Sequence, residues 1–170
     1  MAAQAEAARL PLHRVLIPAQ CSNGDYDRAM AEALRAARKE GVTRMIFGDL
    51  FVEDIRAYRE RQLAGTGIVP VFPLWNRPTR ELAHEMIAAG LVAYVTCLDK
   101  QKLPRELAGQ VFDRGFLARL PSQVDPCAER GEFHTCVTAG PMFAHPIPVE
   151  VGETVERDGF VFVDLRLSAG

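Results

Sequence analysis

The stretch RMIFGDLFVEDIRAYRERQLAGTGIVPVF (residues 44–72) reads as a strand, a helix and a second strand. Its two ends, 44–49 and 69–72, are short apolar runs of the kind that buried parallel strands show on both faces. Between them, apolar side chains recur at helical spacing, and two glycines end the helix. Two parallel strands joined by a helix form the unit from which α/β sheets are built.

The alternation of strand and helix continues on both sides of this stretch. Upstream, HRVLIP (13–18) is a short apolar run, and the helix after it has Ser22 as its expected N-cap, with Asp25 three residues later. Downstream, a helix over about 78–90 precedes another apolar run. We therefore predict an α/β fold whose parallel sheet is built from 13–18, 44–49, 69–72 and 91–98.

The pattern changes after residue 99. Short helical pieces broken by proline and glycine come first. The last stretch alternates apolar and polar residues around Asp158-Gly159, a favoured hairpin turn, and predicts a β-hairpin over about 147–165. The chain is thus expected to consist of an α/β part over 1–98 and an α+β part over 99–170.

The composition argues against several classes of function. The 170 residues carry a formal net charge of −2 without a basic patch, which does not suit a nucleic-acid-binding protein or a protein of anionic membrane surfaces. No apolar run approaches the roughly 20 residues of a membrane helix, and the first residues lack the apolar core of a signal peptide. We expect a cytoplasmic protein whose four cysteines are reduced thiols.

Residues that directly follow strands are candidate site residues, because ligands of parallel α/β sheets bind at the carboxyl ends of strands. Asp49 and Asp99 both lie there, although each could equally cap a helix or turn. Glu53 lies in the next helical turn, beside an N-terminus that can hold an anion; the alternative is a solvated helix start with salt bridges. Trp75, the only tryptophan, is either structural or an aromatic wall for a ligand.

A second candidate region is CAERGEFHTCV (127–137), which places a histidine and two glutamates between two cysteines. A zinc ion could use the cysteines and the histidine. However, six residues separate the first cysteine from the histidine and one separates the histidine from the second cysteine, which matches no common zinc pattern. We therefore expect no metal here.

The alternatives for this region are an exposed acidic turn and a binding loop for a charged small molecule. In the binding loop, Gly131 allows a tight turn that presents Glu129 and Glu132. Strand alternation after the turn would place Glu132 and His134 on one face and Phe133 on the other.

The chain resembles the diphthine–ammonia ligase family in five segments that follow one another in this order: FGDLFVEDIRAYRE, VFPLW, PTRELAHEMIAAG, VTCLD and CAERGEFHTCVTAGPMF. The family comprises ATP pyrophosphatases of the adenine nucleotide α-hydrolase-like superfamily. The resemblance implies a Rossmann-like nucleotide-binding domain in 1–98 and a substrate-binding region in 99–170. It also implies a reaction in which ATP, with magnesium, adenylates a substrate carboxylate, pyrophosphate leaves, and ammonia attacks the acyl-adenylate to form an amide.

The resemblance also implies roles for residues, without assigning a catalytic one. Asp49 and Glu53 are expected on the nucleotide side. Diphthine carries a trimethylammonium group and an imidazole, and carboxylates with aromatic neighbours attract such a cation. In the family's acidic loop, glycine usually stands where this chain has Ala128, and asparagine or glycine where it has Arg130. Substrate binding is expected at Trp75, Glu129, Gly131, Glu132, Phe133 and His134, converging with the nucleotide side on one cleft.

One feature of the family is missing from these 170 residues, the Ser-Gly-Gly-Lys-Asp-Ser loop that holds the ATP phosphates. The resemblance implies that the first βαβ unit is absent, so that 13–18 is poorly paired or lies beside 44–49. Two hypotheses stay open. The first is an ATP-dependent amide ligase domain that is inactive in these 170 residues because the phosphate loop is missing. The second is a noncatalytic remnant that binds a nucleotide or a metabolite. The expected partners are a small-molecule or modified-protein carboxylate substrate and ammonia, with a homodimer as an open alternative.

Overall fold

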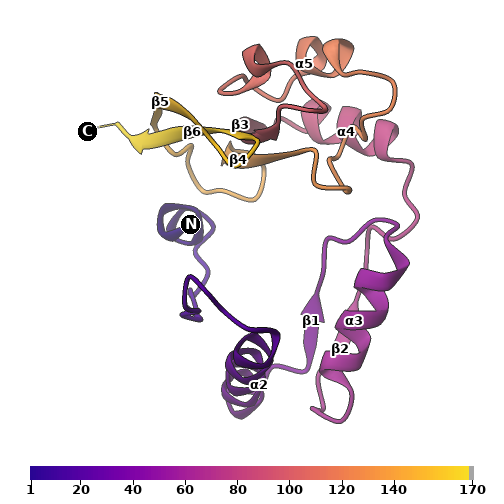
Figure 1. Cartoon of the computed structure of the whole chain (residues 1–170). Helices are drawn as coiled ribbons and strands as arrows, with labels where there is room; N and C mark the ends of the chain where they lie inside the picture. Colours follow the sequence, from indigo (N-terminus) through magenta and orange to yellow (C-terminus); the bar gives the residue numbers. More distant parts are fainter. Residues whose placement is uncertain (169–170) are drawn as a thin grey trace. The chain divides into compact units, whose positions relative to one another are not determined.

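The computed structural model describes residues 1–168, which divide into two compact units with one sheet each. Unit 1 combines Met1–Leu12 with the chain from Pro78 onward, and unit 2 is His13–Arg77. The colours of Figure 1 follow the chain from unit 1 into unit 2 and back. No helix among the described residues is long and apolar enough to cross a membrane.

Unit 2 contains the predicted strand–helix–strand element. Strands β1 (Arg44–Ile46) and β2 (Val69–Val71) pair in parallel, and α3 (Glu53–Leu63) connects them. Its small core consists of Leu34, Leu63 and Ile68, with Ala37, Met45 and Phe47 packed against it. The prediction for 44–72 is therefore confirmed.

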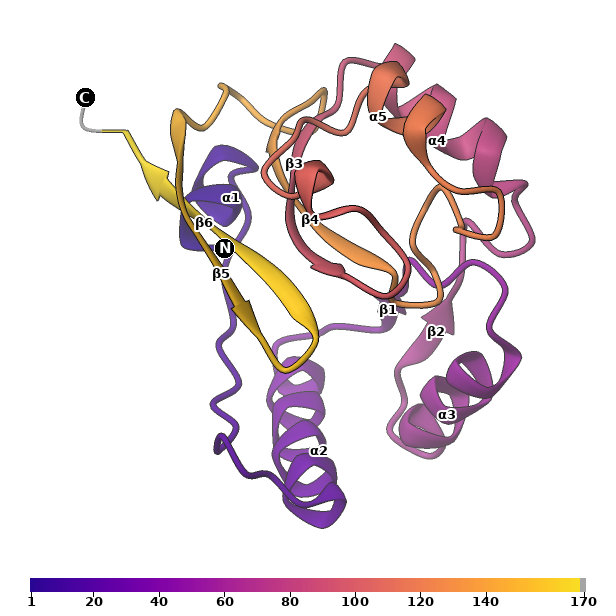
Figure 2. The ribbon, with the colours of Figure 1, turned by 45° about the horizontal axis from the view of Figure 1, so that its top comes forward.

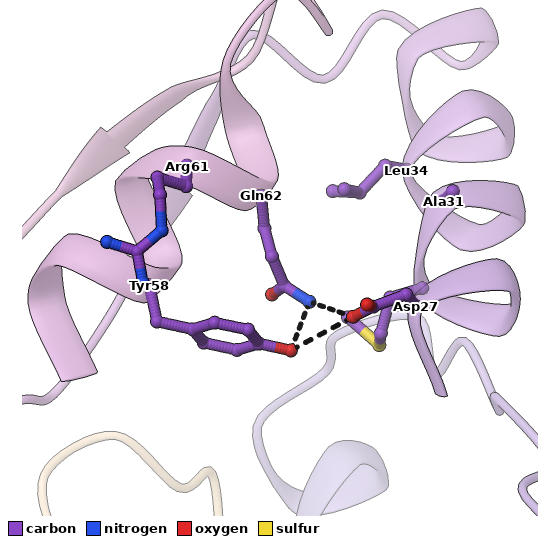
Figure 3. Close-up of a pocket in the computed structure, with 7 residues that line it drawn as sticks. Asp27, Ala31, Leu34, Tyr58, Arg61 and Gln62 are labelled. Atoms are coloured by element: carbon purple, nitrogen blue, oxygen red, sulfur yellow. Dashed lines mark hydrogen bonds between the residues drawn. The ribbon is translucent and has the colours of Figure 1, made fainter. Parts of the chain in front are cut away.

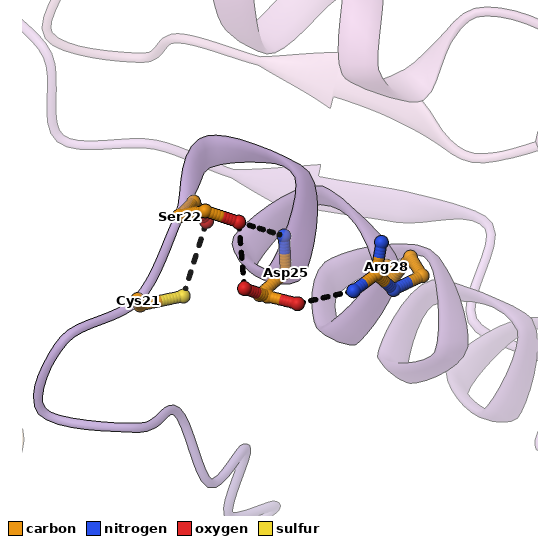
Figure 4. A network of polar contacts seen from close by, with 4 residues as sticks. All are labelled: Cys21, Ser22, Asp25 and Arg28. Carbon is orange, nitrogen blue, oxygen red and sulfur yellow. Dashed lines mark hydrogen bonds and ion pairs between the residues drawn. The ribbon is translucent and has the colours of Figure 1, made fainter.

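Helix α2 (Asn23–Lys39) begins as its sequence predicts. The Ser22 hydroxyl oxygen accepts a hydrogen bond from the Asp25 backbone N–H at 3.1 Å, and the hydroxyl donates to the Asp25 carboxylate at 2.6 Å (Figure 4). The Ser22 hydrogen bonds, and then the nearby Arg28 guanidinium, lower the pKa of Asp25. Ser22 is thus the N-cap that its spacing to Asp25 indicates.

The strand expected at 13–18 is absent, so the prediction of a strand there is wrong, whereas the alternative that this segment is poorly paired is confirmed. Among the described residues, β1 and β2 pair only with each other, and 13–18 has no strand partner. Its Leu16 side chain is 89% exposed. A strand is stable only where its backbone N–H and C=O groups find partners, so apolar composition alone does not make one.

Unit 1 is built on an antiparallel sheet in the order β4-β3-β6-β5. Its strands are β3 (Val92–Asp99), β4 (Phe133–Ala139), β5 (Val149–Arg157) and β6 (Phe160–Leu167). The predicted C-terminal hairpin is confirmed as β5 and β6. The expectation that β3 runs in a four-stranded parallel sheet is wrong, because β3 pairs antiparallel with both β4 and β6. An apolar run buried on both faces suits either kind of sheet, so the sequence did not distinguish them.

The helices of unit 1 are α1 (Ala2–Ala7), α4 (Thr79–Ala88), the 3-10 turn η1 (Arg105–Leu107) and α5 (Arg114–Arg119). Figure 2 shows α4 and α5 next to each other beside β3 and β4. One core cluster joins the α4 side chain Ala83, the α5 side chain Phe116 and the β3 side chain Leu98. Because α4 and β3 share this core with the C-terminal strands, both belong to unit 1, which resumes at Pro78.

Helix α1 ties the start of the chain to unit 1. Ala7 is fully buried, and its carbonyl accepts a hydrogen bond from the Ala144 N–H at 2.7 Å. The Gln4 side-chain amide donates to the Val137 carbonyl at 2.9 Å, on β4. These contacts place a sequence-distant segment beside β4, the strand that follows the two glutamates of 127–137.

Candidate functional site

The acidic loop, residues 125–132, is the ordered turn that leads into β4. Glu132 is only 2% exposed. Its Oε1 accepts a hydrogen bond from the Asp125 N–H at 3.3 Å, and its Oε2 accepts one from the Arg130 N–H at 3.1 Å. A single buried carboxylate therefore holds both ends of the turn.

A second carboxylate fixes the middle of the acidic loop. The Asp125 Oδ2 accepts a hydrogen bond from the Glu129 N–H at 2.9 Å. The turn closes through the Gly131 N–H, which donates to the Ala128 carbonyl at 2.9 Å. Gly131 has φ of +73°, a conformation that glycine adopts without steric cost, so the tight turn expected at this position is present.

The two residues after the turn lie in contrasting surroundings. Phe133 is 3% exposed, and its ring packs edge-on against Phe116 with centroids 5.2 Å apart. His134 is exposed on β4. The expected sharing of one strand face by Glu132 and His134 is wrong, because β4 begins at Phe133 and Glu132 still belongs to the turn.

In unit 2, the residues that follow β1 and β2 meet at the carboxyl edge of the parallel pair. The Asn76 N–H donates to the Leu50 carbonyl at 2.7 Å and joins the two loops. Asp49 lies in the loop after β1, and its Oδ2 is 3.8 Å from the Arg59 Nε. Neither atom has a hydrogen-bond partner among the described residues, and both are closed to solvent. Glu53 is exposed at the start of α3.

Trp75 is covered by an arginine that the sequence analysis did not assign to the site. The Arg56 guanidinium carbon lies 4.7 Å from the Trp75 ring centroid and 4.8 Å from that of Phe72. One turn along α3, Arg59 lies 5.1 Å from the Phe47 ring centroid. These are cation–π distances. The sequence does contain a hint of these contacts: Arg56 and Arg59 are three residues apart on the helix that joins the two strands, and aromatic residues follow each strand.

The comparisons with known proteins bear on unit 1 most directly. Residues 78–166 match the family model of the diphthamide synthase C-terminal domain. The chain belongs to the diphthine–ammonia ligase family. The matched range begins at Pro78, where the main part of unit 1 begins, and it includes the whole acidic loop. The family resemblance is thereby confirmed, and three of its five segments lie within the matched range.

Curated members of the diphthine–ammonia ligase family align with nearly the whole chain. The rat (Rattus norvegicus) and mouse (Mus musculus) diphthine–ammonia ligases are 27% and 28% identical to it, over 96% of this chain and 68% of each relative. The bovine (Bos taurus) enzyme is 27% identical over 93% of this chain and 65% of its own length. The chain thus spans about two thirds of the length of the curated relatives it matches.

The structure gathers the predicted ligase-family residues into two groups. Asp49, Glu53 and Trp75 lie at or beside the carboxyl edge of β1 and β2 in unit 2. Unit 1 brings together Glu129, Gly131, Glu132, Phe133 and His134. Convergence of the two groups on one cleft stays a prediction. Asp125 was missed, because its role depends on a backbone contact four residues along the chain.

Unit 2 also contains a pocket of about 350 Å³ between α2 and α3, which the sequence did not predict. Figure 3 shows polar groups at one side of it: the Tyr58 hydroxyl donates to the Asp27 carboxylate at 3.2 Å, and the Gln62 amide donates to both. Partial burial and then the hydrogen bond to Asp27 raise the pKa of Tyr58. Since these groups bond to one another, the contacts serve to join the two helices.

Ala128 is expected to be a strained position in the acidic loop, because it has φ of +56° and is not glycine. Relief of this strain, about 1–2 kcal/mol, exceeds the extra unfolded-state entropy of glycine, about 0.5–1 kcal/mol. The Ala128 methyl group also packs against the core of unit 1, so its loss offsets part of this gain. Ala128→Gly should therefore raise the free energy of unfolding by less than about 1 kcal/mol, measured by urea denaturation. As a matched control, Ala118→Gly on the exposed face of α5 should lower it. Destabilisation by both variants would contradict the strain.

Cys127 is expected to resist alkylation. Its thiol donates to the Thr79 carbonyl at 3.2 Å, and burial, followed by the charges of Asp125 and Glu129, raises its pKa to about 12. The reactive thiolate therefore stays scarce until the pH approaches that value. At about pH 8, iodoacetamide should label Cys127 roughly a hundredfold more slowly in the native chain than in urea, as followed by peptide mass spectrometry. Equal rates would show that the thiol is not held as described.

Proposed function

We propose that unit 1 binds the substrate of an ATP-dependent amidation and that the acidic loop recognises a positively charged group next to the carboxylate to be amidated. The observation that carries the proposal is the acidic loop itself, an ordered turn inside the range matched by the family model. Asp125, Glu129 and Glu132 with Arg130 leave it a net charge of two negatives. Such a loop favours a cation by Coulomb attraction.

The relatives' name, diphthine–ammonia ligase, points to the substrate class. Diphthine carries a trimethylammonium group next to a carboxylate. The two groups together form a betaine. Glu129 would face the trimethylammonium, and the exposed His134 lies two residues beyond Glu132 for a further polar contact. We propose the betaine group as the feature recognised, ammonia as the second substrate, and the cytoplasm as the location.

We propose Asp49 and Glu53, at or beside the carboxyl edge of β1 and β2 in unit 2, as the residues on the nucleotide side of the site. Bound ATP would supply the adenylate that activates the carboxylate. The residues present do not form a triphosphate site of the usual kind, because the 170 residues contain no glycine-rich loop with a lysine. Nor do any three histidine, cysteine or carboxylate side chains of residues 1–168 gather as metal ligands.

A titration with glycine betaine tests the proposed substrate class. Heteronuclear NMR should show chemical-shift changes in the backbone amides of 125–134 as betaine is added. The matched control ligand is tert-butylacetate (the 3,3-dimethylbutanoate anion). It has the same shape and the same carboxylate as betaine, with a carbon atom in place of the charged nitrogen. Equal shifts with both ligands, or shifts confined to other parts of the chain, would refute recognition of the cation by the acidic loop.

A further inference from the structure

We infer that Asp125 and Glu132 are positioning residues that hold the Glu129 backbone for ligand binding, rather than ligand contacts themselves. The inference rests on the proposed function of the acidic loop and refines it. The resemblance alone treats Glu129 and Glu132 as equivalent substrate-side carboxylates, and it says nothing of Asp125. The structure separates the three by burial and by hydrogen-bond partners.

Glu132 is not placed to contact a ligand directly in this arrangement, although its charge adds to the negative field of the loop. Its side chain is buried, and its two oxygens face the N–H groups of Asp125 and Arg130 at the two ends of the turn. To contact a ligand, the carboxylate would have to leave this buried position, and two backbone donors would lose their acceptors, which is costly inside a protein. Glu132 therefore shapes the loop and does not touch the ligand.

The hydrogen bonds form a relay that ends at Glu129. Glu132 holds the Asp125 N–H, and the Asp125 carboxylate holds the Glu129 N–H at 2.9 Å. The Arg130 N–H, next along the chain, is held by Glu132 again. The backbone on both sides of the Glu129 α-carbon is thus fixed by carboxylates, while the Glu129 side chain itself is half-buried.

The charge and shape of Glu132 are both needed for this arrangement. A carboxylate can accept two hydrogen bonds at separate oxygens, and bonds to an ionised acceptor are the stronger kind. Glutamine has the same shape but only one carbonyl oxygen, so Glu132→Gln must leave one of the two N–H groups facing an amide nitrogen. Asp125→Asn weakens the single bond to the Glu129 N–H, because a neutral amide oxygen replaces an ionised acceptor.

Amide hydrogen exchange on the full chain tests the relay directly. In Glu132→Gln, exchange of the Asp125 or the Arg130 amide should speed up about tenfold or more, and the Glu129 amide should follow. The control variant is Glu150→Gln, an exposed residue of β5, which should not change these rates. Unchanged exchange in Glu132→Gln would overturn the inference.

Binding separates positioning from mere stability. At a temperature where every variant is fully folded, Glu132→Gln and Asp125→Asn should raise the Kd for glycine betaine about tenfold. A purely structural role would lower the Tm and leave this Kd unchanged, which would refute positioning. If the unaltered chain binds no betaine, the proposed substrate class fails, and the exchange rates alone then decide whether the relay holds Glu129.

Discussion

Replacing Phe133 with alanine is expected to destabilise unit 1 by about 3–5 kcal/mol, the range found for large aromatic side chains removed from cores. Phe133 is 3% exposed and lies in one cluster with the rings of Phe112 and Phe116. Removal of its ring leaves a cavity at the point where β4 begins. A loss of this size is a large share of the 5–15 kcal/mol of a typical domain.

Urea denaturation followed by circular dichroism measures this loss. The control is Phe160→Ala, since Phe160 is half-buried and lies outside the core cluster of unit 1, so its loss should cost much less. The family resemblance implies that Phe133 contacts the substrate. A Phe133→Ala chain of unchanged stability that no longer binds betaine would support that role and contradict the structural one.

The second large effect concerns catalysis by the 170-residue chain alone, which should release no pyrophosphate from ATP above the uncatalysed rate. Phosphoryl chemistry needs preorganised donors on the phosphates, and each such donor is worth about 3–4 kcal/mol of barrier. The sequence contains no glycine-rich lysine loop to supply them. In unit 2, the arginines nearest the strand ends, Arg56 and Arg59, are engaged by aromatic rings and carboxylates.

A pyrophosphate-release assay, with betaine and ammonium present, checks this expectation. A curated relative such as the rat diphthine–ammonia ligase, assayed with its own substrate, serves as the positive control. Robust release by the short chain that disappears in Asp49→Asn would contradict the prediction. It would also show that unit 2 forms a working phosphate site around Asp49 without a glycine-rich lysine loop.

The parts of the fold that the sequence predicted are those decided by local signals. Strand–helix–strand periodicity identified 44–72, the spacing of Ser22 to Asp25 identified a helix start, and Asp158-Gly159 identified the hairpin turn. Each depends on residues within a few positions of one another. The direction of β3 and the fate of 13–18 depend instead on which distant backbone comes to pair with them.

The candidate site shows the same division. The tight turn at Gly131 was predictable, because glycine is suited to positive φ. The burial of Glu132 was not, because strand alternation was applied to a residue that lies before the strand begins. The stacking of Arg56 on Trp75 joins a helix to a loop after the next strand, and it could be recognised only with both elements placed.

The assignment of the acidic loop as the substrate site depends on whether Glu129 binds the positively charged group of the substrate. The Kd values of glycine betaine and tert-butylacetate would be measured by NMR titration for the unaltered chain and for Glu129→Gln. We expect the unaltered chain to prefer betaine about tenfold, a difference of about 1.4 kcal/mol, and Glu129→Gln to lose most of that preference. A preference of the same size in both proteins, or none in the unaltered chain, would contradict the assignment of the acidic loop as the substrate site.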